Sequence, residues 1–149
     1  MSIINVANRI LDNLGTMTTM RLQKLTYYAQ AHSLATTDRE LFYEDFEAWD
    51  NGPVSLELFN RYQDKVIIHR GCLIMSLYER EHPLNKSQLK LIDTVSKKLK
   101  NCSGLTLYNR VITEMPWRIT RMPHGENKCC EDIILKSYMK TYYKAYPAI

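Results

Sequence analysis

The residue types that could catalyse a reaction or bind a metal ion are dispersed along this chain of 149 residues. The four histidines occupy four different segments, and the cysteines are Cys72, Cys102, Cys129 and Cys130. They have neither the paired spacing of a zinc site nor the regular spacing of a secreted disulfide framework. The adjacent pair, Cys129 and Cys130, is too close for an ordinary disulfide and has no further ligand at a useful spacing. We interpret this pair as two small, partly buried residues before the last helix, with a redox or metal site as the alternative, and we expect no cofactor or metal.

Motifs of the common enzyme classes do not occur in the chain. No two of the five glycines lie close enough to build a phosphate-binding loop, and neither H-E-x-x-H nor G-x-S-x-G is found. Paired carboxylates such as Glu131 and Asp132 come without a second feature that implies acid–base chemistry. We therefore predict a protein that is not an enzyme, with a thiol enzyme as the remaining catalytic alternative.

Basic and aromatic residues alternate near the C-terminal end of the sequence. Lys136, Lys140 and Lys144 are four residues apart and are interleaved with tyrosines, a pattern that could contact phosphates and stack bases. An ordinary amphipathic helix with the lysines outward explains the same spacing. Its inward face would comprise Ile134, Tyr138, Thr141, Tyr142 and Ala145. The net charge of +4 is also below that of a dedicated nucleic-acid binder, so binding through these lysines is kept as an alternative only.

Both tryptophans lie beside prolines, in W-D-N-G-P (49–53) and in E-M-P-W-R (114–118). Tryptophan, methionine and arginine on loops are frequent anchors of protein interfaces. A buried tryptophan that joins loops to a helical core would give the same pattern. The residues alone leave these two readings open.

The elements that must position these residues are mostly helical. Glycine and proline number five each, and apolar residues recur at three-four spacing over long stretches. This periodicity predicts about six helices, at about 3–14, 20–36, 53–62, 85–99, 105–114 and 136–145.

The segment 41–49 alternates instead, which predicts a short strand with Phe42, Glu44, Phe46 and Ala48 on one side. We expect the turn at residues 51–53 to end it and the next helix to start on the proline. We also expect one or two strands within 66–78 to pair with it, and a polar loop to follow residues 115–117. The predicted fold is mainly α: a single compact helical domain, residues 1–149, with a small antiparallel β element.

No stretch resembles a signal peptide or reaches ~18 uninterrupted apolar residues. Apolar residues make up 45% and charged residues 24% of the chain, which are globular values. We expect a cytoplasmic protein without membrane contact.

Four segments occur in an order that resembles the Panacea antitoxin domain, the family of phage-associated GepA-type and SocA-like proteins. They are LQKLTYYAQAHSLA (22–35), LFYEDFEAWDNGPVSLELFNRYQ (41–63), EMPWRITR (114–121) and IILKSYMKTYY (133–143). The resemblance spans nearly the whole chain, and its specific part is K-L-x-Y-Y-A-Q followed by F-x-A-W-x-x-G-P-V. Two departures are Val111-Ile112, where the family often has Thr-His, and Leu135, where it tends to have a helix-capping residue.

The resemblance implies a small, mainly helical antitoxin of a bacterial or prophage toxin–antitoxin system. Such a protein neutralises a cognate protein toxin, encoded nearby, by direct binding, and a homo-oligomer is left open. Alternatives are an adaptor that delivers the toxin to a protease and an operon repressor that binds nucleic acid. The motif residues would form either the rigid frame or the partner-binding surface, and we favour the frame, with Trp49 and Trp117 holding two corners together. These residues are Tyr27, Tyr28, Gln30, Trp49, Asp50, Asn51, Gly52, Pro53, Met115, Pro116, Trp117, Arg118 and Arg121.

Overall fold

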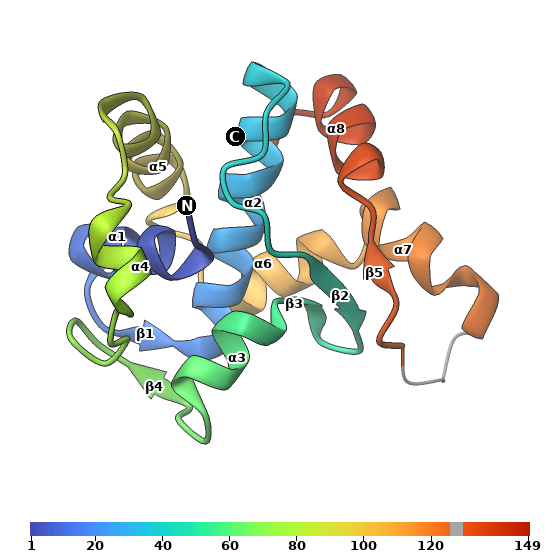
Figure 1. The fold of residues 1–149 in the computed structure, drawn as a ribbon. Coiled ribbons are helices and arrows are strands. Elements are labelled where there is room, and N and C mark those ends of the chain that lie inside the picture. Colours follow the sequence, from blue (N-terminus) through green and yellow to red (C-terminus); the bar gives the residue numbers. More distant parts are fainter. Residues whose placement is uncertain (126–129) are drawn as a thin grey trace.

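The computed structural model describes residues 1–125 and 130–149, and within them the fold is mainly helical (Figure 1). Eight α-helices are present there, rather than the expected six or so. They are α1 Ile3–Leu14, α2 Thr19–Thr37, α3 Leu56–Tyr62, α4 Leu77–Glu81, α5 Lys86–Leu99, α6 Gly104–Val111, α7 Met115–Arg121 and α8 Lys136–Ala145. A short 3-10 helix, η1 (Met122–His124), continues α7.

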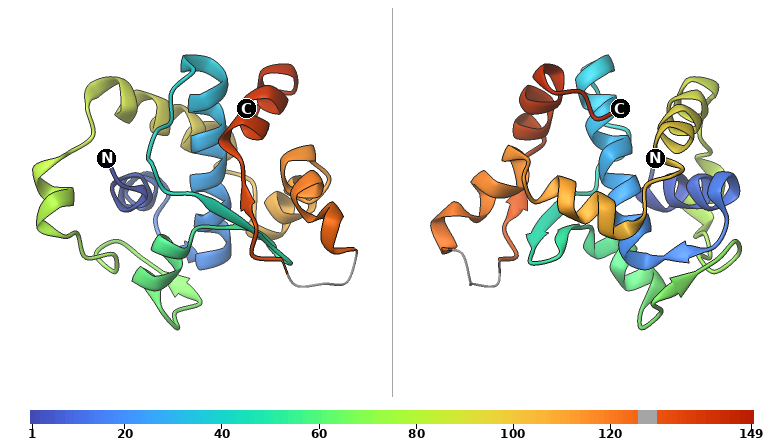
Figure 2. Two further views of the ribbon diagram at one scale, coloured as in Figure 1. Left: turned by 45° about the vertical axis from the view of Figure 1, so that its right-hand side comes forward. Right: turned by 180° about the vertical axis from the view of Figure 1, so that it is seen from behind.

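Helix α2 lies at the centre of the molecule. It packs against α1 and α5 on one side and against α6 and α8 on the other, an arrangement visible from the front and from behind (Figures 1 and 2). Its residues from Leu22 to Ala31 are all buried, so the helix has no solvent face over this stretch. A three-four apolar period therefore understates how much of this helix is buried, and the residue after this stretch, His32, is half-buried.

Several helix ends lie where local capping signals predict them. Gly15 follows α1 with a φ of 76°, a left-handed conformation that favours glycine. The hydroxyl of Thr18 caps α2. Asn85 and Gln88 form a reciprocal capping box at the start of α5.

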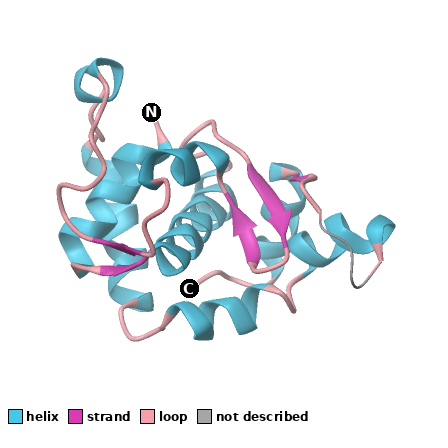
Figure 3. Cartoon of the chain, turned by 90° about the horizontal axis from the view of Figure 1, so that it is seen from below, coloured by secondary structure: helices cyan, strands magenta, loops and turns pink. Residues whose placement is uncertain are grey.

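Two small antiparallel sheets lie at separate places on the molecule (Figure 3). In the first, β1 (Met17–Thr18) pairs with β4 (Ile67–Ile68). In the second, β2 (Phe46–Trp49) lies between β3 (Gly52–Val54) and β5 (Ile133–Ile134). The expectation that 66–78 would pair with 44–49 is wrong, because Val66 instead accepts a hydrogen bond from the Thr19 amide at the start of α2.

The sequence led us to expect that Pro53 starts a helix. Pro53 instead lies in β3, opposite Ala48. Gly52 reverses the chain with a φ of 101°, so that residues 52–54 run back along β2. Because β3 is an edge strand, the missing N–H of proline costs no ladder hydrogen bond. Helix α3 begins after Ser55, whose hydroxyl accepts from the Leu58 amide.

The polar loop expected at 118–127 is wrong for residues 118–124, which α7 (to Arg121) and η1 occupy, and its last two residues lie outside the described part of the chain. Proline is tolerated in the first turn of a helix, where its N–H would have no partner. Thr120 and Arg121 are buried beside Pro116 in spite of their polarity, so the side that packs inward is partly polar.

Helix α8 has the predicted bounds but a different inward face. Met139 and Tyr143 are buried, whereas Tyr138, Thr141 and Ala145 are exposed. Among the described helices, none is long and apolar enough to cross a membrane.

Candidate functional site

A buried cluster of tyrosines joins α2 to α8. Tyr28 and Tyr143 donate hydrogen bonds to Oε1 of Glu114, at 2.5 and 2.9 Å, and the Tyr27 hydroxyl lies 3.4 Å from that of Tyr143. The guanidinium of Arg110 lies over the Tyr28 ring and pairs with Glu114. Burial raises the pKa of all three tyrosines, and the Glu114 charge adds to this effect. The phenols therefore stay protonated and serve as structural donors rather than as acids.

Two glutamines on α2 fix the chain between α2 and α3. The Gln30 side chain accepts from the Leu41 amide and donates to the Phe42 carbonyl, at 2.6 and 2.7 Å. Seven residues earlier, Gln23 makes the same pair of bonds to the backbone of Ser55, at 2.9 and 3.1 Å. Both glutamines are buried, and each satisfies backbone groups that would otherwise lack partners.

The two tryptophan motifs meet at one corner of the molecule. Nε1 of Trp117 donates to the Trp49 carbonyl at 2.9 Å. Arg121 donates to the Ala48 carbonyl at 2.6 Å and pairs with Asp50 at 2.8 Å. Side chains of α7 thus hold the β2–β3 hairpin by two of its backbone carbonyls and by the Asp50 side chain.

The ring of Trp49 contacts α3. It packs against Phe59 of α3, with the ring centroids 5.2 Å apart, and is half-buried rather than mostly buried. Its indole N–H has no acceptor in hydrogen-bonding geometry among the described residues. Burial raises the pKa of the neighbouring Glu47 carboxyl, and the nearby Trp49 N–H makes this rise smaller.

Lys24 lies beneath the corner, against Gly52 of the hairpin. It is 1% exposed and makes no hydrogen bond or ion pair with the described residues. A Cβ atom on Gly52 would lie 3.1 Å from Lys24 Cε and 3.2 Å from Val111, so glycine allows the hairpin to rest on the lysine stem. Burial lowers the pKa of Lys24 to about 8. The sequence gives one signal for this, a lysine within an apolar helix segment, L-Q-K-L.

A groove of about 490 Å³ lies beside β2 and β5 and next to the start of α3. Its lining combines five carboxylates with apolar side chains: Tyr43, Glu44, Asp45, Glu47, Ser55, Leu56, Glu57, Glu131 and Ile133. The apolar side chains are unusually open, with Tyr43 63%, Ile133 49% and Leu56 45% exposed. We name this feature the acidic groove. Sequence reasoning missed it because its residues come from segments far apart in the chain.

The lysines of α8 lie against the segment that follows α2. Lys140 and Lys144 both pair with Asp38, at 2.8 and 2.5 Å, and these bonds lower the pKa of Asp38 to about 2. Lys136 pairs with Asp45 at 2.9 Å and with Glu40 at 3.3 Å. Each of the three ammonium groups therefore already has a carboxylate partner.

The predicted frame or binding residues divide by exposure. Most are buried: Tyr27, Tyr28, Gln30, Gly52, Pro53, Pro116 and Arg121. Trp49 and Trp117 are half-buried, whereas the exposed ones are Asp50, Asn51, Met115 and Arg118. Cys129, one of the adjacent cysteines, lies outside the described residues.

Comparison with known proteins gives a match to a protein-family model. The family model described as "Antitoxin SocA-like, Panacea domain" matches residues 22–118. The matched segment runs from Leu22 in α2 to Arg118 in α7, and so includes the glutamine contacts, both tryptophans and part of the groove, but not Arg121. Searches of curated proteins and of solved structures returned no match. The chain belongs to the family of SocA-like antitoxins with a Panacea domain.

Proposed function

We propose that this protein is the antitoxin of a bacterial or prophage toxin–antitoxin pair and that it neutralises its toxin by stoichiometric binding. Family membership supports the general role, since the matching family is described as antitoxins. The observation that carries the binding mechanism is the acidic groove, where open apolar side chains stand among carboxylates. Such a mixture is suited to a protein partner, because apolar anchors supply affinity and charges select the partner.

The partner surface that fits the acidic groove is basic and carries apolar side chains. The protein as a whole has a net charge of +4, so the groove is an acidic region on a basic molecule. A basic toxin surface would be attracted to the groove and repelled by much of the rest. The toxin would therefore approach with its orientation restricted, which favours one docked complex.

The buried motif residues act in this proposal as the frame of the groove. Gln23 and Gln30 fix both ends of the segment 41–55, which supplies most of the groove lining. Tyr27 and Tyr28 fix α2 against α8. Rigid support of this kind lowers the entropy lost when a partner binds.

The test uses the toxin encoded by a neighbouring growth-arresting gene, titrated with purified wild type and two double variants. The groove variant, Leu56→Ser with Glu131→Lys, changes two exposed residues and should weaken binding at least about tenfold, or about 1.4 kcal/mol. The matched control, Ile119→Ser with Arg118→Glu, makes similar changes on the exposed side of α7 and should bind as the wild type does.

Two outcomes would contradict the proposal in different ways. Loss of binding in the α7 variant alone would place the toxin on α7 instead of the groove. A complex in which the purified toxin stays active until a protease is added would favour the adaptor mechanism over direct neutralisation.

A further inference from the structure

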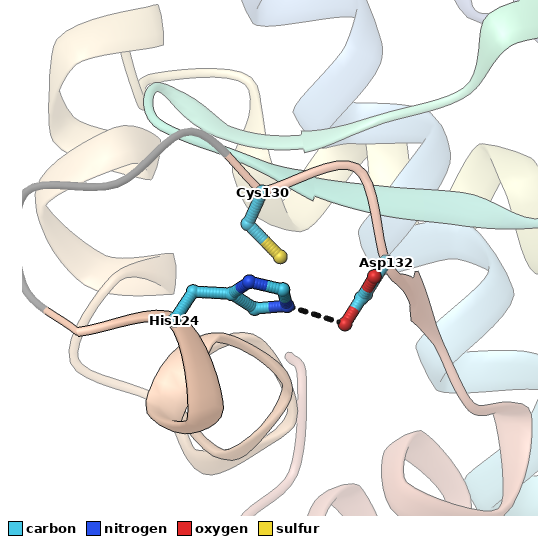
Figure 4. A group of neighbouring side chains, drawn as sticks. All are labelled: His124, Cys130 and Asp132. Carbon is cyan, nitrogen blue, oxygen red and sulfur yellow. Dashed lines mark hydrogen bonds and ion pairs between the residues drawn. The ribbon is translucent and has the colours of Figure 1, made fainter.

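Three potential metal ligands converge beside the end of α7. His124 ends η1, and Cys130 and Asp132 lie in the extended segment that leads into β5. Figure 4 shows their side chains pointing toward one another from these two segments. One ligand atom from each residue lies within 4.8 Å of the other two, and Nε2 of His124 is 2.6 Å from the Asp132 carboxylate.

The local backbone explains why the three side chains meet. Cys130 and Asp132 are two residues apart in extended chain, so their side chains project from the same side. The Asp132 carbonyl accepts a hydrogen bond from the Ala48 amide at 2.9 Å, which holds the segment against β2. His124 enters from the opposite direction at the end of η1. The sequence did not indicate this site because a His-x5-Cys-x-Asp spacing matches none of the common zinc motifs.

The thiol of Cys130 is the least expected member of the group. It is 1% exposed, and it makes no hydrogen bond with any residue that the structure describes. Complete burial leaves no space for a substrate at the sulfur, which argues against a Cys-His-Asp catalytic triad. A buried thiol beside an imidazole and a carboxylate is instead a ligand set that transition-metal ions accept.

We propose that His124, Cys130 and Asp132 bind one divalent transition-metal ion, with Zn²⁺ as the best match. Zinc accepts sulfur, nitrogen and carboxylate oxygen in one tetrahedral site, whereas magnesium and calcium require oxygen ligands. Ideal tetrahedral geometry would place these ligand atoms about 3.3–3.6 Å apart, as calculated from usual zinc–ligand lengths. The histidine–aspartate pair must open by about 0.7 Å from its present 2.6 Å, and the sulfur must approach from within 4.8 Å. Both changes are within the reach of side-chain rotations.

The ion would tie two parts of the chain together. It would join the end of η1 to the segment before β5, and so connect α7 with the three-stranded sheet. The side chains of Asp132 and His124 are 57% and 34% exposed, so the fourth coordination position faces solvent. Water or a donor atom from another molecule can fill it.

The test is a titration of the full-length, metal-free protein with Co²⁺, followed by displacement with Zn²⁺. One Co²⁺ per chain should produce visible d–d bands and a near-ultraviolet thiolate charge-transfer band, and Zn²⁺ should remove both. The thermal midpoint should rise with Zn²⁺ and fall again with a chelator. Cys130→Ser should abolish the thiolate band, and His124→Ala should weaken binding at least about tenfold.

Two cysteine variants serve as controls. Cys102→Ser, which alters a half-buried cysteine elsewhere in the chain, should leave the spectrum unchanged. A thiolate band that survives Cys130→Ser and disappears in Cys129→Ser would overturn the assignment. Absence of a one-to-one cobalt spectrum in the wild type would show that the histidine–aspartate hydrogen bond alone accounts for the cluster. Because the titration involves no toxin, neither result decides the proposed function.

Discussion

Lys24 differs from the other polar residues in the interior of this protein. Gln23, Gln30 and Glu114 are buried as well, but each has hydrogen-bond partners that offset the loss of water. Lys24 has a buried stem and no partner among the described residues, so its charged form is disfavoured. This distinction could not be predicted, because the sequence shows a polar residue on an apolar helix but not whether the fold supplies an acceptor.

We expect Lys24→Met to stabilise the protein at neutral pH. The pKa of Lys24 is about 8 in the folded chain against a reference value of 10.5. Because the pKa is lowered on folding, the charged lysine destabilises the folded state at low pH. This destabilisation is relieved as the pH rises from about 8 to above 10. The difference corresponds to about 3 kcal/mol, and methionine keeps the packing of the stem.

Denaturant unfolding at several pH values would measure this effect. The variant should exceed the wild type by about 2–3 kcal/mol at pH 7, and the gap should narrow toward pH 10. Contributions from the buried tyrosines are common to both proteins and cancel in the difference. A variant that is less stable at pH 7 would mean that the ammonium has a stabilising partner in solution.

Trp49→Ala should show whether Trp49 supports the fold of the corner or contacts the toxin. Because the ring is half-buried against Phe59, its loss should cost about 2 kcal/mol, less than the ~3–5 kcal/mol of a fully buried aromatic residue. Phe59→Ala, which removes the other half of the same contact, is the matched control. Both variants should melt earlier and bind toxin with little change, whereas an unchanged melt with lost binding would make Trp49 a contact residue.

At the scale of the elements, three-four periodicity predicted the bounds of the four longest helices well. Helices α1, α2, α5 and α8 begin and end within about one residue of the predicted positions. The prediction was wrong where one residue type fits two structures. Pro53 suits both a first helical turn and an edge strand, and only the pairing of residues 52–54 with β2 decides between them.

Strand partners were outside the reach of the sequence for a related reason. Strands of two to four residues carry too short an alternation to identify the partner. One of the two partners of β2 proved to be Ile133–Ile134, from the last part of the chain. Likewise, α7 buries Thr120 and Arg121 beside Pro116, and an inward face of mixed polarity gives no clear apolar period.

Helix α8 provides a prediction about nucleic acid. Lys140→Glu with Lys144→Glu should lower the thermal midpoint modestly, because both lysines pair with Asp38 in the folded protein. Toxin neutralisation should persist, since neither residue lines the acidic groove. Lys136 is left unchanged because it contacts the Tyr43 carbonyl and Asp45 at the groove edge.

DNA and RNA binding by the wild type should be weak at physiological salt. Filter binding or fluorescence anisotropy, with Lys140→Gln and Lys144→Gln as a charge-neutral control, would measure it. Tight, salt-sensitive binding that is lost in the Glu variant would favour the repressor alternative.

At the scale of the whole molecule, the acidic groove exists only because the fold brings together residues 43–47, 55–57 and 131–133. Each segment alone carries carboxylates and no basic residue, but the three lie far apart in the sequence, so no local pattern shows that they form one surface. The family resemblance, by contrast, was visible because it rests on contiguous motifs, and the match over residues 22–118 confirms it. Sequence therefore indicated the family and most helices, whereas the location of a binding surface required the tertiary structure.

Neutralisation by stoichiometric binding should not depend on cysteine chemistry. A variant with serine at Cys72, Cys102, Cys129 and Cys130 should inhibit the toxin to the same molar end point as the wild type. It should lose only the thermal stabilisation by Zn²⁺ inferred for Cys130. Circular dichroism, expected to show a mainly helical spectrum for both proteins, verifies that the variant is folded; a folded variant without neutralising activity would support the thiol alternative.

Toxin binding should weaken as salt rises, because the proposed contact opposes an acidic groove to a basic partner. Exposed charges attract over a distance set by the ionic strength, about 10 Å at 0.1 M salt and about 3 Å at 1 M. We expect the association rate to fall at least about threefold between roughly 0.05 and 0.5 M salt, while the dissociation rate, set by the apolar contacts, changes less. Glu131→Lys, which reverses one exposed charge in the groove, should flatten this dependence, and Asp12→Lys, an exposed change outside the groove lining, should leave the slope close to that of the wild type. Stopped-flow or surface-based kinetics would give both rates. A salt-independent association rate, with Glu131→Lys indistinguishable from the wild type, would show that the toxin is recognised without the acidic groove.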